Sequence, residues 1–381
     1  MINAINHTFF YNEIATDFET RVLTLLNKLH ADPHIIRLIF ISTSTVETYD
    51  EEFTIISLLV KAKFGERSPL VSYIIQSPPN PGEMILEVHY LPSGISDESF
   101  SYKQKNKLHY LLIENEESRM LILDHVRSSS LISSVTEQSS EIFSIIESVL
   151  EDEQMQVENI IRQWNYIGDI TEDEVGVQCY HAFNEARSVF YDKGNWTCCG
   201  YPAATGIGME MKGVFVSLIA LQPKRQEINI VAIDSPLQVA AHAYSDKVLV
   251  CTEEKSIHAT PKFERAKLLI NHSGMLCFIS GTAAIRGEES MRVLDVRLQT
   301  KQTIENIRYL IAEENLKRHG VERKPQWSFF GLRVYVKNIT DISTVKSELE
   351  KLWADVTPLF VHADICRPEL LVEIEGIAVS H

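Results

Sequence analysis

The chain has 381 residues, 45% of them hydrophobic and 23% charged, so it is long enough for two or three domains with hydrophobic cores. Its formal net charge of −16 argues against a nucleic-acid binder and against a protein that docks on an anionic membrane. A site for an anionic ligand would need a local cluster of Arg or Lys that works against this overall field.

The cysteines and the N-terminal residues give a first indication of the compartment. The six cysteines are scattered and none forms a C-x-x-C pair, so we expect reduced thiols and no zinc site. The segment Met1–Ala4 begins no basic stretch followed by an apolar one, so we expect no signal peptide. The longest apolar run, near Ile35–Ile41, is too short to span a bilayer. A cytoplasmic protein is therefore predicted.

The first hundred residues show periodic apolar patterns that predict two helices and three strands. The helical spacings cover residues 18–29 and 52–63, and the strand-like runs cover 36–41, 70–75 and 84–90. A fuller version of this order returns twice further along the chain. We therefore interpret residues 1–104 as a divergent N-terminal half-unit of a repeat.

The middle of the chain contains a complete unit. Its predicted strands and helices, in order, are 110–113, 120–123, 139–150 (helix), 160–167, 180–190 (helix), 202–208 and 214–221. The same order, β-β-α-β-α-β-β, returns before the C-terminus. The predicted units are thus 105–223 and 262–381, with 224–261 as a linker or lid. The fold class is α+β, with mixed sheets that carry two helices on one face.

Several motifs resemble known proteins. The C-terminal segments Ile279-Ser-Gly-Thr-Ala-Ala-Ile285 and Leu371-Val-Glu-Ile-Glu-Gly376 are similar to the RidA/YjgF superfamily of chorismate-mutase-like fold, whose free-standing members are trimers. The resemblance is closer to the chorismatase branch of that superfamily. It rests on Arg162-x-Trp-Asn-Tyr166, Tyr180-x-x-Phe-Asn-x-x-Arg187, Pro202-Ala-Ala-Thr-Gly-Ile-Gly208, Ser235-Pro-x-Gln238, Pro261-x-Phe-x-Arg-Ala266, Ser280-Gly-Thr-Ala283 and Ala363-Asp-Ile-Cys-Arg367 before Leu-Leu-Val-Glu373.

The resemblance covers roughly residues 155–381, and no motif can be placed in the first 150 residues. The stretch 240–260 departs from the family pattern, which puts the substrate lid in question. If the units pack as the superfamily's subunits do, the chain forms an intrachain pseudo-trimer. We then expect a monomer or a weak dimer.

Glu373 is the candidate catalytic acid. Alternation along Leu370–Glu375 puts Glu373 and Glu375 on one face of a strand. In an apolar setting desolvation would raise the pKa of such a carboxyl, which suits a general acid, whereas an exposed sheet face with two solvated carboxylates is the alternative. The resemblance implies that the family's catalytic acid falls at Glu373.

The candidate substrate-binding residues are of four kinds. Arg367 and Arg187, and less directly Arg333, offer guanidinium groups for carboxylates, although each could equally form a surface salt bridge. The remaining candidates are Tyr180 as a hydrogen-bond donor or core residue, Cys366 as a site-lining residue whose identity follows product type in the family, and Gly281 and Thr282 as backbone donors to an anion or as a tight turn.

The resemblance implies cleavage of the enolpyruvyl ether of chorismate, a small dianion, into pyruvate and a hydroxybenzoate or a dihydroxycyclohexadiene carboxylate. Neither a metal nor an organic cofactor is expected. A RidA-like imine deaminase is the first alternative, but Ala204, Phe360 and Val71 stand where deaminases carry an Arg. A non-catalytic small-molecule-binding scaffold is the second alternative. Among the possible products, Cys366 favours 3-hydroxybenzoate.

Overall fold

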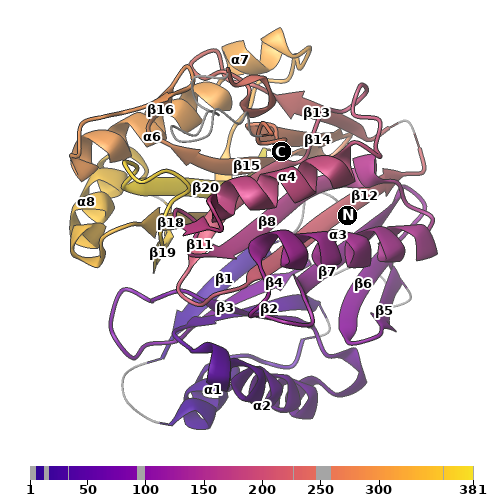
Figure 1. Cartoon of the computed structure of the whole chain (residues 1–381). Helices are drawn as coiled ribbons and strands as arrows, with labels where there is room; N and C mark the ends of the chain where they lie inside the picture. The colour runs from indigo at the N-terminus through magenta and orange to yellow at the C-terminus, as the bar shows by residue number, and fades with distance from the viewer. Residues whose placement is uncertain are drawn as a thin grey trace.

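A computed structural model of the chain describes residues 6–12, 17–32, 34–91, 99–225, 227–245, 259–354 and 356–380. It contains one four-stranded sheet, two six-stranded sheets and two short two-stranded ladders. Each of the three larger sheets belongs to one unit of the chain, and the units follow one another in sequence (Figure 1). The predicted α+β class with mixed sheets is confirmed.

The first sheet has the strand order β1-β4-β2-β3. Its elements are β1 (Asn6–Tyr11), α1 (Phe18–Leu26), β2 (Ile35–Ser42), α2 (Val46–Phe64), β3 (Leu70–Ile75) and β4 (Ile85–Tyr90). Strand β2 is buried along its whole length, as expected for a continuous apolar run. Helix α1 starts where the Asp17 carboxylate accepts the backbone N–H of Thr20. Both helices and three of the strands were predicted, whereas β1 was not.

The second sheet has the order β11-β8-β12-β7-β6-β5. Its elements are β5 (Phe100–Lys105), β6 (Leu108–Glu114), β7 (Ser118–Arg127), α3 (Val135–Asp152), β8 (Ile160–Gly168), α4 (Cys179–Tyr191), β11 (Ala203–Met209) and β12 (Val214–Pro223). A capping box between Ser134 and Glu137 starts helix α3. A two-stranded ladder of β9 (Asp173–Glu174) and β10 (Val177–Gln178) precedes α4.

The third sheet repeats this topology, with the order β19-β18-β20-β15-β14-β13. Its elements are β13 (Asn229–Ile233), β14 (Ala266–Asn271), β15 (Gly274–Ala283), α6 (Val296–Leu310), α7 (Glu313–Arg318), β18 (Ser328–Val336), α8 (Ile342–Leu352), β19 (Leu359–His362) and β20 (Val372–Ser380). A second short ladder joins β16 (Ile285–Arg286) to β17 (Glu289–Ser290).

The strand pairing locates the sheet boundaries earlier than the sequence suggested. The predicted division at 104/105 falls inside β5, which pairs with β6 of the second sheet. Residues 224–261, predicted as a linker or lid, contain β13, which pairs with β14 of the third sheet. Both edge strands are short and partly exposed, so their apolar signal is weak. Residues 246–258 of the predicted lid lie outside the described residues.

The three sheets share one hydrophobic core. A single cluster of buried residues draws on strands of every sheet, including Ile39 of β2, Phe215 of β12 and Phe278 of β15. Two separate clusters lie between the second sheet and α3 and α4, and between the third sheet and α6 and α8. The helices therefore cover the outer faces of the sheets, and the inner faces meet in the middle (Figure 1).

Three buried arginines occupy the same place in the three units. Each lies at the start of the parallel strand pair that recurs in every sheet, opposite Leu70, Ala203 and Leu359. Each forms an ion pair with an acid of the next unit, in a cycle that closes on itself. The pairs are Arg37–Asp124, Arg162–Glu375 and Arg333–Glu87. This cyclic order supports the predicted pseudo-trimer.

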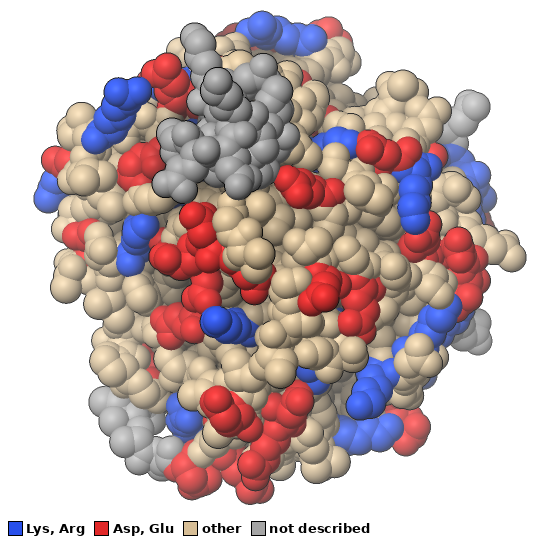
Figure 2. Space-filling view, viewed as in Figure 1, with Lys and Arg blue, Asp and Glu red and all other residues tan. Residues whose placement is uncertain are grey.

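The distribution of charged side chains on the surface agrees with the net charge of −16. On the face drawn in Figure 2, acidic side chains gather near the centre, while lysines and arginines are scattered toward the edges. This face carries no continuous basic stripe of the kind that tracks a nucleic-acid backbone. Among the described residues, no helix is both long and apolar enough to cross a membrane.

Candidate active site

A pocket lies where the second unit meets the third. Its lining residues are Tyr180, Arg187, Ala204, Gly206, Tyr244, Pro261, Phe263, Arg265, Gly281, Ala283, Ile285, Cys366, Arg367 and Glu373. Six of the predicted site residues are among them, although they come from α4, β15, β20 and the loop before β20. The cavity measures about 50 Å³, enough for a few water molecules.

Glu373 lies in the second position of β20, between Ala283 of β15 and Tyr335 of β18. Only 4% of the residue is exposed. Its carboxyl fits because position 281 is a glycine: a Cβ on Gly281 would lie 2.1 Å from the Glu373 Oε1 atom. The β-bulge between Ile279 and Thr282 brings the Gly281 backbone under this carboxyl.

The environment of Glu373 favours the protonated acid. Burial raises its pKa to about 8, and the neighbouring Glu375 carboxylate adds to the rise, while Arg265 and Arg162 oppose it. Among the described residues, none donates a hydrogen bond to this carboxyl. A neutral carboxylic acid is therefore available near neutral pH, which is the state that a general acid needs.

Arg187 extends from α4 into the same pocket. It is 2% exposed, and its Nη2 donates to Asn184 Oδ1 at 2.6 Å. Among the residues that the structure describes, its Nε has no hydrogen-bond partner. The guanidinium lies 5.5 Å from the centre of the Phe183 ring. A buried guanidinium with an unused donor indicates a place for an anionic group.

Two further arginines face Tyr244 in this pocket. Arg265 is 2% exposed, donates to the Tyr244 hydroxyl at 2.6 Å, and leaves its Nε without a partner. The Arg367 guanidinium lies 5.3 Å from the Tyr244 ring centre and donates to Glu288 O and Ser290 Oγ.

These three arginines differ from Arg37, Arg162 and Arg333, which form the cycle of ion pairs. Among the described residues, none of Arg187, Arg265 and Arg367 forms an ion pair with an acid. In a chain of net charge −16, three guanidinium groups without an acidic partner form a local positive region. The pocket is therefore suited to a ligand with more than one carboxylate.

Tyr180 and Cys366 complete the wall near Glu373. Burial raises the pKa of Tyr180 above its usual value, so the phenol stays neutral. Burial also raises the pKa of the Cys366 thiol to about 12, with a further contribution from Glu373. Cys366 is therefore a neutral, small apolar side chain in this pocket and no thiolate nucleophile.

Two predicted residues do not reach the pocket. The Arg333 guanidinium donates to Glu87 at 2.7 Å and to the Tyr166 hydroxyl at 2.6 Å, in the cycle of ion pairs. The Thr282 hydroxyl donates to the carbonyl of Ser280. The Gly281 N–H, expected as an anion donor, donates instead to Thr205 Oγ1 at 3.1 Å. Gly281 thus provides space for the acid in place of a hydrogen bond.

Arg265 and Tyr244 line the pocket but were not predicted as site residues. Arg265 lies in the motif Pro261-x-Phe-x-Arg-Ala266, which was noted for its resemblance only. Its position beside Glu373 depends on β14 pairing with β15, and β14 was not predicted. Tyr244 lies within the divergent stretch 240–260, which has no recognisable pattern, so only its contacts with the two arginines identify it.

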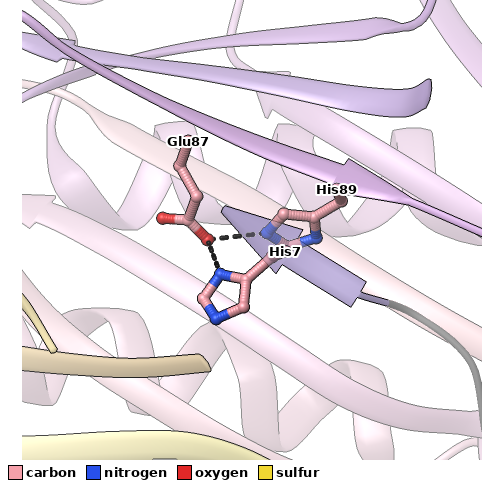
Figure 3. Close-up of side chains that lie close together, drawn as sticks. All are labelled: His7, Glu87 and His89. Atoms are coloured by element: carbon pink, nitrogen blue, oxygen red, sulfur yellow. Dashed lines mark hydrogen bonds and ion pairs between the residues drawn. The ribbon is translucent and has the colours of Figure 1, made fainter. Parts of the chain in front are cut away.

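A second polar cluster lies at the junction of the first and third units. His7 of β1 and His89 of β4 are directly opposite, and Glu87 precedes His89 by two residues (Figure 3). Glu87 Oε1 lies 2.6 Å from His89 Nε2 and 3.3 Å from His7 Nδ1. Two histidines and a carboxylate this close could hold a metal ion.

The charges around this cluster favour hydrogen bonding over metal binding. The other oxygen of Glu87 is already paired with Arg333. The adjoining cavity, about 20 Å³, is also lined by Arg162, whose Nε and Nη1 have no partner. A divalent cation there would face two guanidinium groups across a short distance, so we assign no metal site.

Comparison with known proteins agrees with this geometry. Residues 95–220 match the family described as "Chorismatase FkbO/Hyg5-like, N-terminal". The chain is 30% identical over 228 residues to a 3-hydroxybenzoate synthase of Streptomyces hygroscopicus, covering 58% of this chain and 64% of that protein. It is 34% identical over 225 residues to a chorismatase of Streptomyces rapamycinicus, with the same shares covered. The chain thus aligns with slightly less than two thirds of these relatives.

The fold similarity extends further than the sequence similarity. A crystal structure of a chorismatase superposes with a TM-score of 0.69 at 20% identity, covering 98% of this chain and 99% of that one. Residues 95–220 are thus similar to the N-terminal part of chorismatases, and almost the whole chain has the fold of that solved chorismatase. The family match begins about sixty residues before the point at which motifs suggested a resemblance.

The raised pKa of Glu373 predicts a pH-dependent difference in stability. In the unfolded chain a Glu has a pKa of about 4.3. In the folded protein it is raised to about 8. The folded state therefore holds this proton more tightly, and the wild type loses stability as pH rises between these values. Glu373→Gln resembles the protonated acid and avoids this loss.

Urea unfolding of both proteins between pH 5 and pH 9 tests this expectation. The stability of Glu373→Gln relative to wild type should increase as the pH rises and level off above the folded-state pKa. A constant difference across this range would mean that Glu373 is ionised throughout, and the assignment of a neutral acid would fail.

Proposed function

We propose that the chain cleaves the enolpyruvyl ether of chorismate and releases pyruvate. The observation that carries this proposal is one pocket that combines a neutral buried acid, Glu373, with three arginines that have no acidic partner among the described residues. Chorismate carries two carboxylates, which the arginines can bind, and an acid-labile vinyl ether, which the neutral acid can protonate. The curated relatives named chorismatase and 3-hydroxybenzoate synthase point to the same substrate.

In this mechanism Glu373 donates its proton to the terminal carbon of the enolpyruvyl group. The ether carbon then becomes an oxocarbenium-like centre, and the Glu373 carboxylate that remains lies close to the positive charge. Attack by water, or by the ring hydroxyl, gives a tetrahedral centre that expels pyruvate. Water attack is a net hydrolysis, whereas hydroxybenzoate and pyruvate together contain all the atoms of chorismate.

The three arginines would bind the two carboxylates and orient the ether toward Glu373. Among the described residues, the Nε–H groups of Arg187 and Arg265 have no acceptor, and the Arg367 guanidinium lies 5.3 Å from the centre of the Tyr244 ring. Because the cavity of about 50 Å³ is smaller than a ring dicarboxylate, lining side chains must move on binding.

An imine deaminase is less well supported. In the deaminase members of the superfamily an Arg holds the substrate carboxylate at the position of Ala204. Ala204 lines the pocket here and offers no charge. The arginines of this pocket approach from α4, from the residue before β14 and from the loop before β20, so they surround a ligand that is charged at more than one place.

Glu373→Gln is predicted to lower kcat by about 100-fold or more, the usual scale for loss of a general acid. KM should change little, because the arginines provide the binding energy. Pyruvate release from chorismate, coupled to lactate dehydrogenase, measures both constants. Glu87→Gln is the matched control, since Glu87 holds the equivalent place in the first unit and pairs with Arg333. A near-normal rate in Glu373→Gln, together with loss of activity in Glu87→Gln, would contradict the assignment.

The product is proposed to be 3-hydroxybenzoate, and Cys366 provides the test. The neutral thiol fills the pocket wall next to Glu373. Cys366→Ala opens space for a water molecule that competes with the ring hydroxyl, so the product should shift toward the dihydroxycyclohexadiene carboxylate. Liquid chromatography of the reaction mixture measures the ratio. Only the diene diol from the wild type would contradict the proposal.

The chain is proposed to be a monomer or a weak dimer, because its own three units already close the cycle of ion pairs. A heterologous interface that closes within one chain leaves no equivalent patch free for a second chain. Gel filtration with light scattering at micromolar concentration should therefore give the mass of one chain, 43.4 kDa, or a concentration-dependent dimer. A tight homotrimer would contradict this expectation.

A further inference from the structure

A second buried acid lies next to Glu373. Glu375 is two residues further along β20, so both side chains extend to the same face of the strand. Glu373 lies opposite Tyr335 and Glu375 opposite Arg333 on the neighbouring strand β18. Glu375 is 4% exposed, the same as Glu373. Two buried carboxyl groups at this spacing cannot both be ionised without a cost, so their surroundings decide which one carries the charge.

The surroundings of Glu375 require it to be a carboxylate. Its Oε2 accepts hydrogen bonds from Arg162 Nη2 and from the Thr205 hydroxyl. Its Oε1 accepts from the Tyr335 hydroxyl at 3.0 Å and lies 3.5 Å from Arg333 Nη1. All these groups are donors, so both oxygens of Glu375 act as acceptors, as the oxygens of a carboxylate do.

Thr205 connects this carboxylate to the floor of the pocket. Its Oγ1 accepts from Arg162 Nη2 at 2.7 Å and from the Gly281 N–H at 3.1 Å. The hydroxyl proton is therefore free to be donated to Glu375. Gly281 is also the residue over which the Glu373 carboxyl lies. The fixed charge of Glu375 is thus held at a constant position relative to the acid.

The groups that face Glu373 come from several elements. Glu375 contributes a negative charge and raises the pKa of Glu373, whereas Arg265 before β14 and Arg162 of β8 lower it. Tyr180 of α4 and the Cys366 thiol are neutral neighbours. Arg187 and Arg367 line the same pocket. With so many guanidinium groups nearby, burial and the Glu375 charge are what oppose ionisation of Glu373.

We propose that Glu375 is a positioning residue for the reaction. Its fixed negative charge keeps Glu373 in the protonated form that donates a proton to the vinyl ether. This inference rests on the proposed function of Glu373 as the general acid. It gives the ion pair between Arg162 and Glu375 a second purpose beyond joining the second unit to the third. The other two ion pairs of the cycle have no such neighbour in the pocket.

Glu375→Gln and Asp124→Asn form a matched pair of variants. Each removes a buried carboxylate that is paired with an equivalent arginine, Arg162 or Arg37, so each should cost a similar amount of stability. Asp124 lies at the junction of the first and second units, outside the pocket. Glu375→Gln leaves Arg162 without a partner, so the double variant Arg162→Met/Glu375→Gln provides a second test that buries no single charge.

Two measurements are made on each protein. Infrared difference titration, without substrate, follows the protonated carboxyl band that disappears in Glu373→Gln, and so reports the protonation midpoint of Glu373 directly. The pH profile of pyruvate release reports the same group during turnover. Wild type should show a midpoint near 8. In Glu375→Gln the midpoint should fall by about one pH unit or more, the usual effect of a close charge.

The value of kcat in each variant should follow the protonation midpoint of Glu373. A fall of one unit lowers the protonated fraction at pH 8 roughly fivefold, so kcat at that pH falls by a similar factor while KM is unchanged. The double variant should show a smaller fall, because loss of Arg162 acts in the opposite direction. Asp124→Asn should keep the wild-type midpoint and profile. A wild-type midpoint in the double variant, or an equal shift in Asp124→Asn, overturns the proposal.

The two measurements separate this inference from the proposed function. If the infrared midpoint falls in Glu375→Gln but wild type releases no pyruvate from chorismate, then Glu375 controls Glu373 and the substrate assignment is wrong. If pyruvate is released and the midpoint does not move, the function stands and the role of Glu375 is only to join two units.

Discussion

The structure depends on three buried arginines that find their acids only in the next unit. Arg37, Arg162 and Arg333 occupy equivalent places on β2, β8 and β18, and each is paired across a junction between units. Removing one partner of such a pair leaves an uncompensated buried charge, at a cost of about 3–5 kcal/mol. The three sheets must therefore dock in cyclic order, with their apolar inner faces in one shared core.

A second set of three arginines faces the pocket and takes no part in the cycle of ion pairs. Arg187, Arg265 and Arg367 face the pocket between the second and third units without an acidic partner among the described residues. The two sets lie close together, since Arg265 and Arg162 both lower the pKa of Glu373. Glu375 separates them, because it neutralises Arg162 and leaves the pocket arginines free for an anionic ligand.

The three junctions are related in topology but differ in chemistry, which supports a single active cleft per chain. The place of Glu373 is taken by Ser217 in the second unit and by Glu87 in the first. Ser217 donates to Asp124, and the aromatic rings of Tyr49, His125 and Phe215 fill that junction. Glu87 is paired with Arg333, which keeps its pKa well below the usual range, so it cannot act as an acid.

The sequence by itself determined the α+β class, the repeat and most of the elements, because apolar periodicity reflects which face of each helix and strand is buried. It also identified Glu373 through a motif, and put Glu373 and Glu375 on one face through the two-residue period of a strand. Only the tertiary structure decided that Glu375 is the ionised acid, that Arg265 and Tyr244 belong to the pocket, and that Arg333 does not. These facts depend on contacts between residues of different elements, such as Arg162 and Glu375, which are 213 positions apart, and local patterns contain no information on such pairs.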